Sequence, residues 1–356
     1  MKKNKFRGFA TMLFAGVMAL SGCGGGETTT GANAEDDTQY VLKVATVLAD
    51  TSPNAVALYN FEEELEKKSG GRIDVQVYTG GVLAASDEQG VEMVMSGAIE
   101  MAVDPAFALG KATNTPEYEI FDYPFIFRTR EVMNRYAQTD LIQGLDAKVQ
   151  ENYDIKLMGY YDISWLDIGN TVRPFVDPHV DGKGLKIRCA MGSIWVDTMQ
   201  SLGPTAVPMA YGEVFSALQQ GTLDGVLTTA SNMYAGRFYE VLDYITMSDH
   251  ILSVYVVMVN GPFYDSLPAD LQVTLEECVN EFRADAQKLF AEDEATLADN
   301  LRAEGVEVYE FTDDDFTIWK EVVQPAVDKN VDATLGREFY EETIQLIEGI
   351  EVDLGV

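Results

Sequence analysis

Residues 41–47 read VLKVATV and residues 73–78 read IDVQVY, with a helical pattern between them. The second run alternates apolar and polar residues, which is typical of a half-buried strand. Between the runs, apolar residues recur at i, i+3 and i+7 from Leu58 to Leu65, and Gly70-Gly71 supplies a helix end. A strand, a helix and a strand in this order predict a β-α-β unit, and therefore an α/β fold.

The same alternation returns further along the chain. Short strand-like runs occur at 99–103, 186–189, 223–227 and 254–260, and a helical pattern covers 213–220. This recurrence favours α/β lobes over an all-helical or all-strand protein.

One helical pattern is much longer than the others. From residue 271 to 304 apolar residues keep helical spacing, and the first glycine is Gly305. About 34 residues at about 1.5 Å each make a helix of roughly 50 Å, which exceeds the diameter of one small lobe. The pattern predicts a helix that braces two lobes, or two helices joined by a bend. The remaining residues predict further helices with acidic faces.

The N-terminus has the pattern of an export signal. Basic residues at 2–7 precede an apolar run at 8–20, which at roughly 20 Å of helix is too short to cross a bilayer core of about 30 Å. The run ends in LSGC at 20–23, which looks like a bacterial lipobox. We predict a lipoprotein signal peptide at 1–22, and a lipidated Cys23 with a flexible linker at 23–39. The protein would then be exported and anchored to a membrane; an ordinary signal peptide with a free cysteine is the alternative.

Charge and composition exclude several functions. The chain has 58 acidic and 25 basic residues and a formal net charge of −33, so it lacks the basic footprint of a nucleic-acid binder. Two histidines argue against a His-rich metal site. The chain also lacks the G-x-S-x-G, H-E-x-x-H, C-x-x-C, P-loop and G-x-G-x-x-G motifs. We therefore expect no cofactor and no enzyme activity; a secreted hydrolase with paired carboxylates such as Asp104 and Glu213 is the alternative.

Two cysteines, Cys189 and Cys278, remain in the body of the chain. Export permits a disulfide between them, but their spacing does not require one. We expect two buried free thiols.

Several strings resemble one family. Residues 182–188 read GKGLKIR, 212–221 read GEVFSALQQG and 223–225 read LDG, and they follow GAIEMA at 97–102 and YPFIFR at 123–128. In this order and spacing the strings are similar to those of the solute-binding proteins of TRAP transporters, the C4-dicarboxylate-type family. The resemblance extends over about residues 40–310.

The resemblance implies a two-lobed periplasmic-binding-protein-like fold with a hinge and a long lobe-spanning helix. The expected lobe I is 40–165 plus 254–290, and the expected lobe II is 166–253 plus 291–356. It also implies a monomer that captures a small organic anion between the lobes and delivers it to integral membrane subunits driven by an ion gradient. A ligand-binding module that feeds a sensor would have the same cleft.

The resemblance also suggests the ligand contacts. Arg188 corresponds to an arginine that clamps the ligand's acid group, and a planar guanidinium can pair bidentately with a carboxylate. Tyr211 corresponds to an aromatic residue beside the ligand. Glu213 is expected either to orient Arg188 or to begin a helix, where an acidic residue is favoured.

Two positions depart from the family pattern. After Trp165, Leu166 occupies the position of a second arginine, which removes a charge clamp and suggests a ligand with one strong anionic group or an apolar tail that Trp165 contacts. Thr228 occupies the position of a ligand-binding asparagine, for which Asn232 is a nearby substitute.

The remaining candidates come from their positions along the chain. Asp104 follows a strand and either accepts hydrogen bonds from the ligand or forms a turn before Pro105. Phe107 and Met191 are expected either to line the site or to pack in the core. The sequence leaves a dicarboxylate, a monocarboxylate, a sugar acid and a sulfonate all open as ligands.

Overall fold

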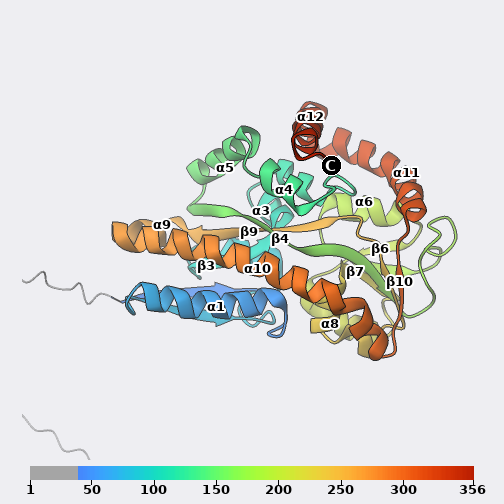
Figure 1. Ribbon diagram of the computed structural model, residues 1–356, viewed down its shortest axis with the longest axis horizontal. Helices are drawn as coiled ribbons and strands as arrows, with labels where there is room; N and C mark the ends of the chain where they lie inside the picture. The colour runs from blue at the N-terminus through green and yellow to red at the C-terminus, as the bar shows by residue number, and fades with distance from the viewer. Residues whose placement is uncertain (1–38) are drawn as a thin grey trace, which may run out of the picture. The chain divides into compact units, whose positions relative to one another are not determined.

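The structure, a computed structural model, describes residues 39–356. Strands and helices alternate along this part of the chain, and helices cover a mixed sheet (Figure 1). The predicted α/β class is confirmed. The export signal, Cys23 and the linker up to residue 38 lie outside the described residues.

The strands are β1 (Tyr40–Ala45), β2 (Ile73–Tyr78), β3 (Met101–Pro105), β4 (Ile155–Asn170), β5 (Lys186–Cys189), β6 (Thr205–Pro208), β7 (Gly225–Thr229), β8 (Tyr244–Met247), β9 (Leu252–Asn260) and β10 (Glu307–Glu310).

The α-helices are α1 (Pro53–Lys68), α2 (Asp87–Met95), α3 (Ala106–Ala112), α4 (Arg130–Tyr136), α5 (Asp140–Asn152), α6 (Ser193–Ser201), α7 (Val214–Gln219), α8 (Ala230–Ala235), α9 (Gly261–Ser266), α10 (Ala269–Ala303), α11 (Asp313–Asn330) and α12 (Arg337–Leu354). Three short 3-10 helices are η1 (Pro116–Asp122), η2 (Tyr211–Glu213) and η3 (Phe238–Glu240), and a π-helical turn is η4 (Val331–Leu335).

The strands follow the order β2-β1-β3-β9-β4-β7-β5-β6, and β8 and β10 branch from β4. β1 and β5 pair with their neighbours in parallel, whereas β4 and β9 run antiparallel to the strands beside them. β4 joins the two halves of the sheet. Its residues up to Trp165 pair with β9, and from Leu166 onward they pair with β7.

The long helix α10 is uninterrupted from Ala269 to Ala303, which confirms the first of the two expected arrangements. Its N-terminal part packs against α1 and β4. Phe61 of α1 and Phe282 of α10 meet edge to face there at 5.8 Å between ring centroids. Its C-terminal part contributes Leu297 and Leu301 to a separate core around β7. One helix therefore spans two hydrophobic cores, as expected for a two-lobed fold (Figure 1).

Local sequence signals explain where several helices begin. Ser52 caps α1 through its side chain and Pro53 follows at the first helical position. Thr312 and Asp315 form a reciprocal capping box at the start of α11, so the acidic run at 313–315 begins a helix. The C-terminal helices contact both parts of the fold, since α11 packs on α6 and α12 packs on α4.

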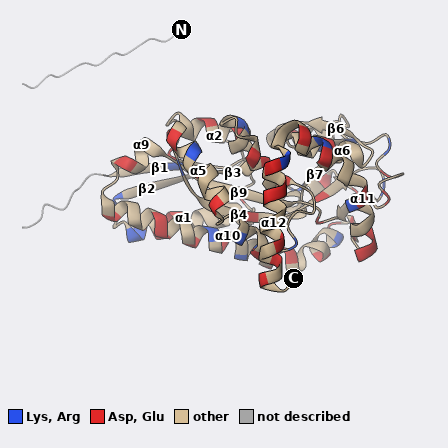
Figure 2. Cartoon of the chain, turned by 90° about the horizontal axis from the view of Figure 1, so that it is seen from above, with Lys and Arg blue, Asp and Glu red and all other residues tan. Residues whose placement is uncertain are grey.

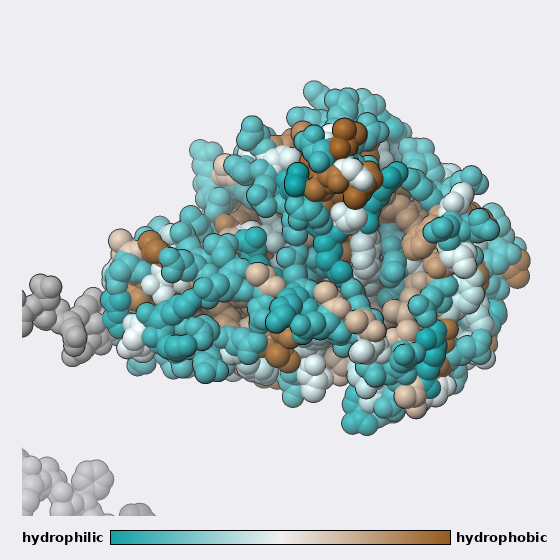
Figure 3. Space-filling view, in the orientation of Figure 1, coloured by the Kyte–Doolittle hydropathy of each residue, from teal (hydrophilic) through white to brown (hydrophobic). Residues whose placement is uncertain are grey.

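Acidic residues are spread along the helices in Figure 2. The face seen in Figure 3 is largely hydrophilic, and its most prominent apolar cluster lies near α12. Cys189 and Cys278 are both free and buried, which confirms the expected thiols. The lobe boundaries expected from the sequence stay predictions.

Candidate functional site

Arg188 lies on β5, in the interior of the sheet, and is only 4% exposed. Its Nε donates to the carbonyl oxygen of Met209 at 2.9 Å, and its Nη1 donates to that of Leu227 at 3.5 Å. Within residues 39–356 its Nη2 donates no hydrogen bond. Burial lowers the pKa of Arg188 and the negative charge of Asp87 opposes that effect, so the guanidinium is a buried cation with a free donor edge.

Tyr211 lies over this guanidinium. The ring centroid is 5.7 Å from the Arg188 Cζ, within reach of a cation–π interaction. The ring also stacks on Phe238 at 5.9 Å, and its hydroxyl donates to the backbone carbonyl of Asn232 at 3.3 Å. These contacts hold the tyrosine ring beside the Arg188 guanidinium, and its contact with a ligand stays a prediction.

Arg188 and Tyr211 line a small cavity of about 30 Å³. Three more of the predicted residues line it as well: Phe107, Thr228 and Asn232. Thr228 comes from β7, and Asn232 lies one helical turn later in α8, whose start is capped by the Thr229 hydroxyl. Five of the nine predicted ligand contacts therefore meet in one place.

Asp87 is the carboxylate of this cavity. It begins α2, is 8% exposed, and its Oδ1 has no hydrogen-bond partner. Burial raises the pKa of Asp87 to about 7, although the Arg188 charge opposes the shift. Asn232, which also lines the cavity, has a buried Oδ1 without a hydrogen-bond partner as well. The cavity therefore contains two acceptor oxygens for which the protein supplies no donor.

Asp104 lies close to this group but does not line the cavity; the next residue, Pro105, does. Asp104 is 1% exposed on β3, and burial followed by repulsion from Asp87 raises its pKa well above the usual range. Its carboxyl fits against Gly90, where a Cβ would lie 2.3 Å from Asp104 Oδ2. The side chain thus faces α2.

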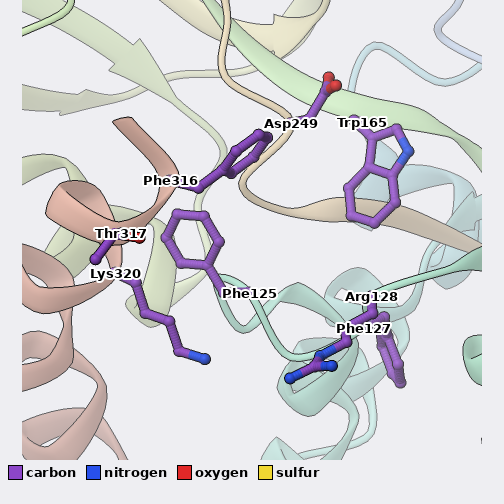
Figure 4. Close-up of a pocket in the computed structure, with 8 residues that line it drawn as sticks. All are labelled: Phe125, Phe127, Arg128, Trp165, Asp249, Phe316, Thr317 and Lys320. Atoms are coloured by element: carbon purple, nitrogen blue, oxygen red, sulfur yellow. The ribbon is translucent and has the colours of Figure 1, made fainter. Parts of the chain in front are cut away.

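Trp165 is separated from Arg188 by a break in β4. The β4–β9 register shifts between Asp162 and Trp165, and the intervening Ser164 has φ 90°. As a result Ile163 and Leu166 line the Arg188 cavity, whereas Trp165 lines a different cavity of about 470 Å³ (Figure 4). The structure does not bring Trp165 to the proposed ligand.

Two other candidates also lie elsewhere. Glu213 is exposed at the end of η2 and is not among the residues lining the cavity, so the carboxylate beside Arg188 is Asp87 and not Glu213. Met191 is 36% exposed and lines neither cavity, which corrects the expectation of core packing. Neither Asp104 nor Glu213 lines the Arg188 cavity, so these two carboxylates do not meet there.

Sequence reasoning missed Asp87, Trp195, Ser253 and Tyr255, which all line the cavity. Asp87 follows Ser86 at the start of a helix, where an acidic residue is ordinary. Ser253 and Tyr255 had a usable signal, because they alternate with valines in β9 and so share one face of the strand. Trp195 packs against Phe107 at 5.7 Å between ring centroids, a contact with no local signature.

Comparison with known proteins agrees with this geometry. Residues 44–333 match the family model described as bacterial extracellular solute-binding protein, family 7. The chain is 30% identical to the C4-dicarboxylate-binding periplasmic protein DctP of Rhodobacter capsulatus over 290 residues. These residues make up 81% of this chain and 86% of that relative.

Two further relatives carry sugar acids in their names. The 2,3-diketo-L-gulonate-binding periplasmic protein YiaO of Escherichia coli is 25% identical over 261 residues, 73% of this chain and 78% of that protein. The solved sugar acid binding protein of Advenella mimigardefordensis, in complex with galactonate, superposes with a TM-score of 0.82 at 25% identity over 88% of this chain and 99% of that one. Within residues 39–356, no helix has the length and apolarity needed to cross a bilayer.

Proposed function

Because the chain belongs to the family of bacterial extracellular solute-binding proteins, family 7, we propose that it binds a hydroxylated organic carboxylate at Arg188 and delivers it to the membrane subunits of a TRAP transporter. The observation that carries this proposal is the buried Arg188, which lines the cavity beside Tyr211 and whose Nη2 donates no hydrogen bond within residues 39–356. A carboxylate pairing there would gain a charge-assisted hydrogen bond in a site shielded from water.

The charges of the cavity favour one carboxylate over two. Among its described lining residues Arg188 is the one cation. Leu166, which also lines the cavity, lies where the family pattern has a second arginine. A second carboxylate on the ligand would lie near Asp87 or among apolar side chains. We therefore infer a monocarboxylate.

The unpaired acceptors favour hydroxyl groups on the ligand. Asp87 Oδ1 and Asn232 Oδ1 are buried acceptors without donors, and leaving such groups unpaired costs about 1–3 kcal/mol each. Ligand hydroxyls would satisfy both. The galactonate complex of the Advenella relative supports a sugar-acid-like ligand for this chain.

A thermal-shift screen of organic acids, including galactonate, gluconate and succinate, tests the ligand class. A ligand at 100 times its Kd stabilises the fold by about 2.7 kcal/mol, which such a screen detects. We expect sugar acids to shift the melting temperature more than succinate does. A larger shift with succinate would reject the monocarboxylate assignment.

Calorimetry of Arg188→Ala with the best acid from the screen tests the site. Losing a charge-assisted hydrogen bond in a buried site should weaken binding at least about 100-fold. Far-ultraviolet circular dichroism should show that the variant folds, and Arg173→Ala, outside the cavity, should bind as the wild type does. Affinity of Arg188→Ala within about threefold of wild type would show that the acid binds elsewhere.

We also propose that Cys23 carries a lipid and that the protein acts as a monomer tethered to the membrane surface. The LSGC string at 20–23 and the apolar run before it support the anchor. The intact mass of the exported protein, compared with that of a Cys23→Ser variant, tests it. An unmodified Cys23 in the membrane fraction would exclude the anchor.

A further inference from the structure

The cavity beside Trp165 is separate from the Arg188 cavity, and the proposed function does not use it. Its volume of about 470 Å³ lies in the range of small-molecule sites. Four segments far apart in the sequence line it: the loop with Phe125 and Arg128, β4 at Trp165, the connection between β8 and β9 at Asp249, and α11 with Phe316 and Lys320. No lining residue belongs to both cavities.

Aromatic rings form the walls of this cavity. Phe125 and Phe316 meet edge to face at 6.3 Å between centroids, and Trp165 lies across from them (Figure 4). Phe316 is held from behind by Phe311 at 5.5 Å. Flat, supported walls on two sides suit a planar apolar group.

The two ends of the cavity differ in charge. Arg128 and Lys320 lie toward one end and Asp249 toward the other (Figure 4). Within residues 39–356 Lys320 forms no ion pair or side-chain hydrogen bond, and Arg128, 64% exposed, pairs with Glu351 at 3.4 Å. At the cationic end, the Lys320 ammonium therefore has no carboxylate paired with it, although the protein as a whole is strongly acidic.

The backbone is strained at this cavity. Phe125 has φ 58° and Asp249 has φ 44°, and Ser164 with φ 90° precedes Trp165. A bulky residue such as phenylalanine rarely adopts the left-handed region. Phe125 is kept there by its N–H, which donates to the carbonyl oxygen of His250 at 2.7 Å. Strain of this kind persists where the surrounding fold enforces it, and it gathers at binding sites.

We propose that this cavity is a second ligand site, which binds a small aromatic carboxylate. The ring lies between Trp165 and the Phe125–Phe316 pair, the carboxylate faces Lys320 and Arg128, and a hydroxyl at the opposite end donates to Asp249. This site goes beyond the proposed transport ligand, and its existence does not depend on what Arg188 binds.

A tryptophan fluorescence titration of the purified protein with 4-hydroxybenzoate tests the proposal. We expect saturable quenching, weakened about fivefold or more by Lys320→Gln and restored by Lys320→Arg. The matched control is Lys148→Gln, which removes another exposed lysine and should leave the affinity unchanged. Equal affinities of Lys320→Gln and Lys148→Gln, or no saturable quenching, would overturn the proposal.

The location of the probe is tested independently. Trp165 lines the second site and Trp195 lines the Arg188 cavity, while the third tryptophan, Trp319, packs against Phe311 next to the second site. Quenching should therefore persist in Trp195→Phe and be reduced in Trp165→Phe. Arg188→Ala should bind 4-hydroxybenzoate within about twofold of wild type. If quenching is instead lost in Trp195→Phe and kept in Trp165→Phe, the probe binds in the transport site and the second site is rejected. This comparison does not require Arg188→Ala to fold.

Discussion

Arg188 is oriented by neutral partners. Two backbone carbonyls accept its hydrogen bonds and the Tyr211 ring lies over it, so its direction is fixed without neutralising its charge. A buried charge that is incompletely paired is costly, and a ligand carboxylate would relieve that cost. The one carboxylate of the cavity, Asp87, gives only partial compensation, because burial favours its protonated form.

Asp87 makes stability depend on pH. Its folded pKa of about 7 lies above the ordinary aspartate value of 3.8, so the folded state keeps a proton that the unfolded state loses. The free energy of unfolding therefore falls as pH rises from about 4 through about 7. Between pH 5 and pH 8 we expect Asp87 to lower it by about 2–3 kcal/mol, and Asp87→Asn to remove that part of the dependence. Urea unfolding at several pH values measures it.

The control for Asp87 is Asp265→Asn, an exposed aspartate outside both cavities. It should keep the pH dependence of the wild type. Other buried carboxyls such as Asp104 and Asp167 have raised pKa values as well. The informative quantity is therefore the difference between the variants in how the free energy of unfolding changes with pH. Parallel pH curves for Asp87→Asn and the wild type would refute the assignment.

At the scale of the elements, Asp224-Gly225 fixes how three strands meet. The Asp224 carboxylate accepts from the Lys186 N–H at 2.8 Å, and its backbone carbonyl accepts from the Thr171 N–H at 2.9 Å. A Cβ on Gly225 would lie 2.4 Å from the carbonyl oxygen of Gly169. The Leu-Asp-Gly string therefore sets the register of β4, β5 and β7, which carries Arg188 and Thr228 to the cavity.

Gly225→Ala should destabilise the fold by about 1–3 kcal/mol, because the backbone of β4 would have to move. Gly144→Ala is the matched control: Gly144 lies within α5 with nothing within 4 Å of its would-be Cβ, and alanine there should stabilise by about 0.5–1 kcal/mol. Urea denaturation measures both. Gly225→Ala as stable as the wild type would show that the close approach is not needed.

Regular elements could be predicted, whereas the irregular ones that shape the site could not. α10 could be predicted from its uninterrupted helical spacing of apolar residues. β1, α1 and β2 could be predicted because strand-like runs flank a stretch with helical spacing. Trp165 was assigned to the cleft because nothing in the sequence marks the register break: Ser164 adopts φ 90° without being a glycine. Asp87 resembled a helix-start residue, and its meeting with Arg188 depends on how α2 packs on β3 and β9, which the local sequence does not encode.

At the scale of the whole chain, a net charge of −33 would repel the proposed anionic ligand. Acidic residues are spread along the helices (Figure 2), and salt screens exposed charges beyond about 8 Å at physiological ionic strength. Arg188 is buried between the strands, so its local field governs the cavity. Selectivity for an anion therefore depends on one interior cation, and the surface charge serves solubility.

If the proposed ligand binds at Arg188, the small size of the cavity implies that the two lobes move apart to admit it. A volume of about 30 Å³ holds one or two water molecules, far less than any sugar acid needs. The lining residues come from both sides of the point where β4 changes partners, with Ile163 before it and Leu166, Arg188 and Thr228 after it. Entry of a ligand therefore means separation about β4 and β9, and contacts from both sides would then favour closure.

Small-angle X-ray scattering of the purified protein, with and without the acid identified by the screen, tests this closure. Saturation should reduce the radius of gyration by on the order of 1 Å, out of roughly 20 Å for a domain of this length. This result is expected if the unliganded protein samples open forms and the ligand shifts the population to closed ones. Arg188→Ala in the same acid controls for solvent effects and should not contract. An unchanged radius at a saturation verified by calorimetry would mean that the ligand enters without hinge motion.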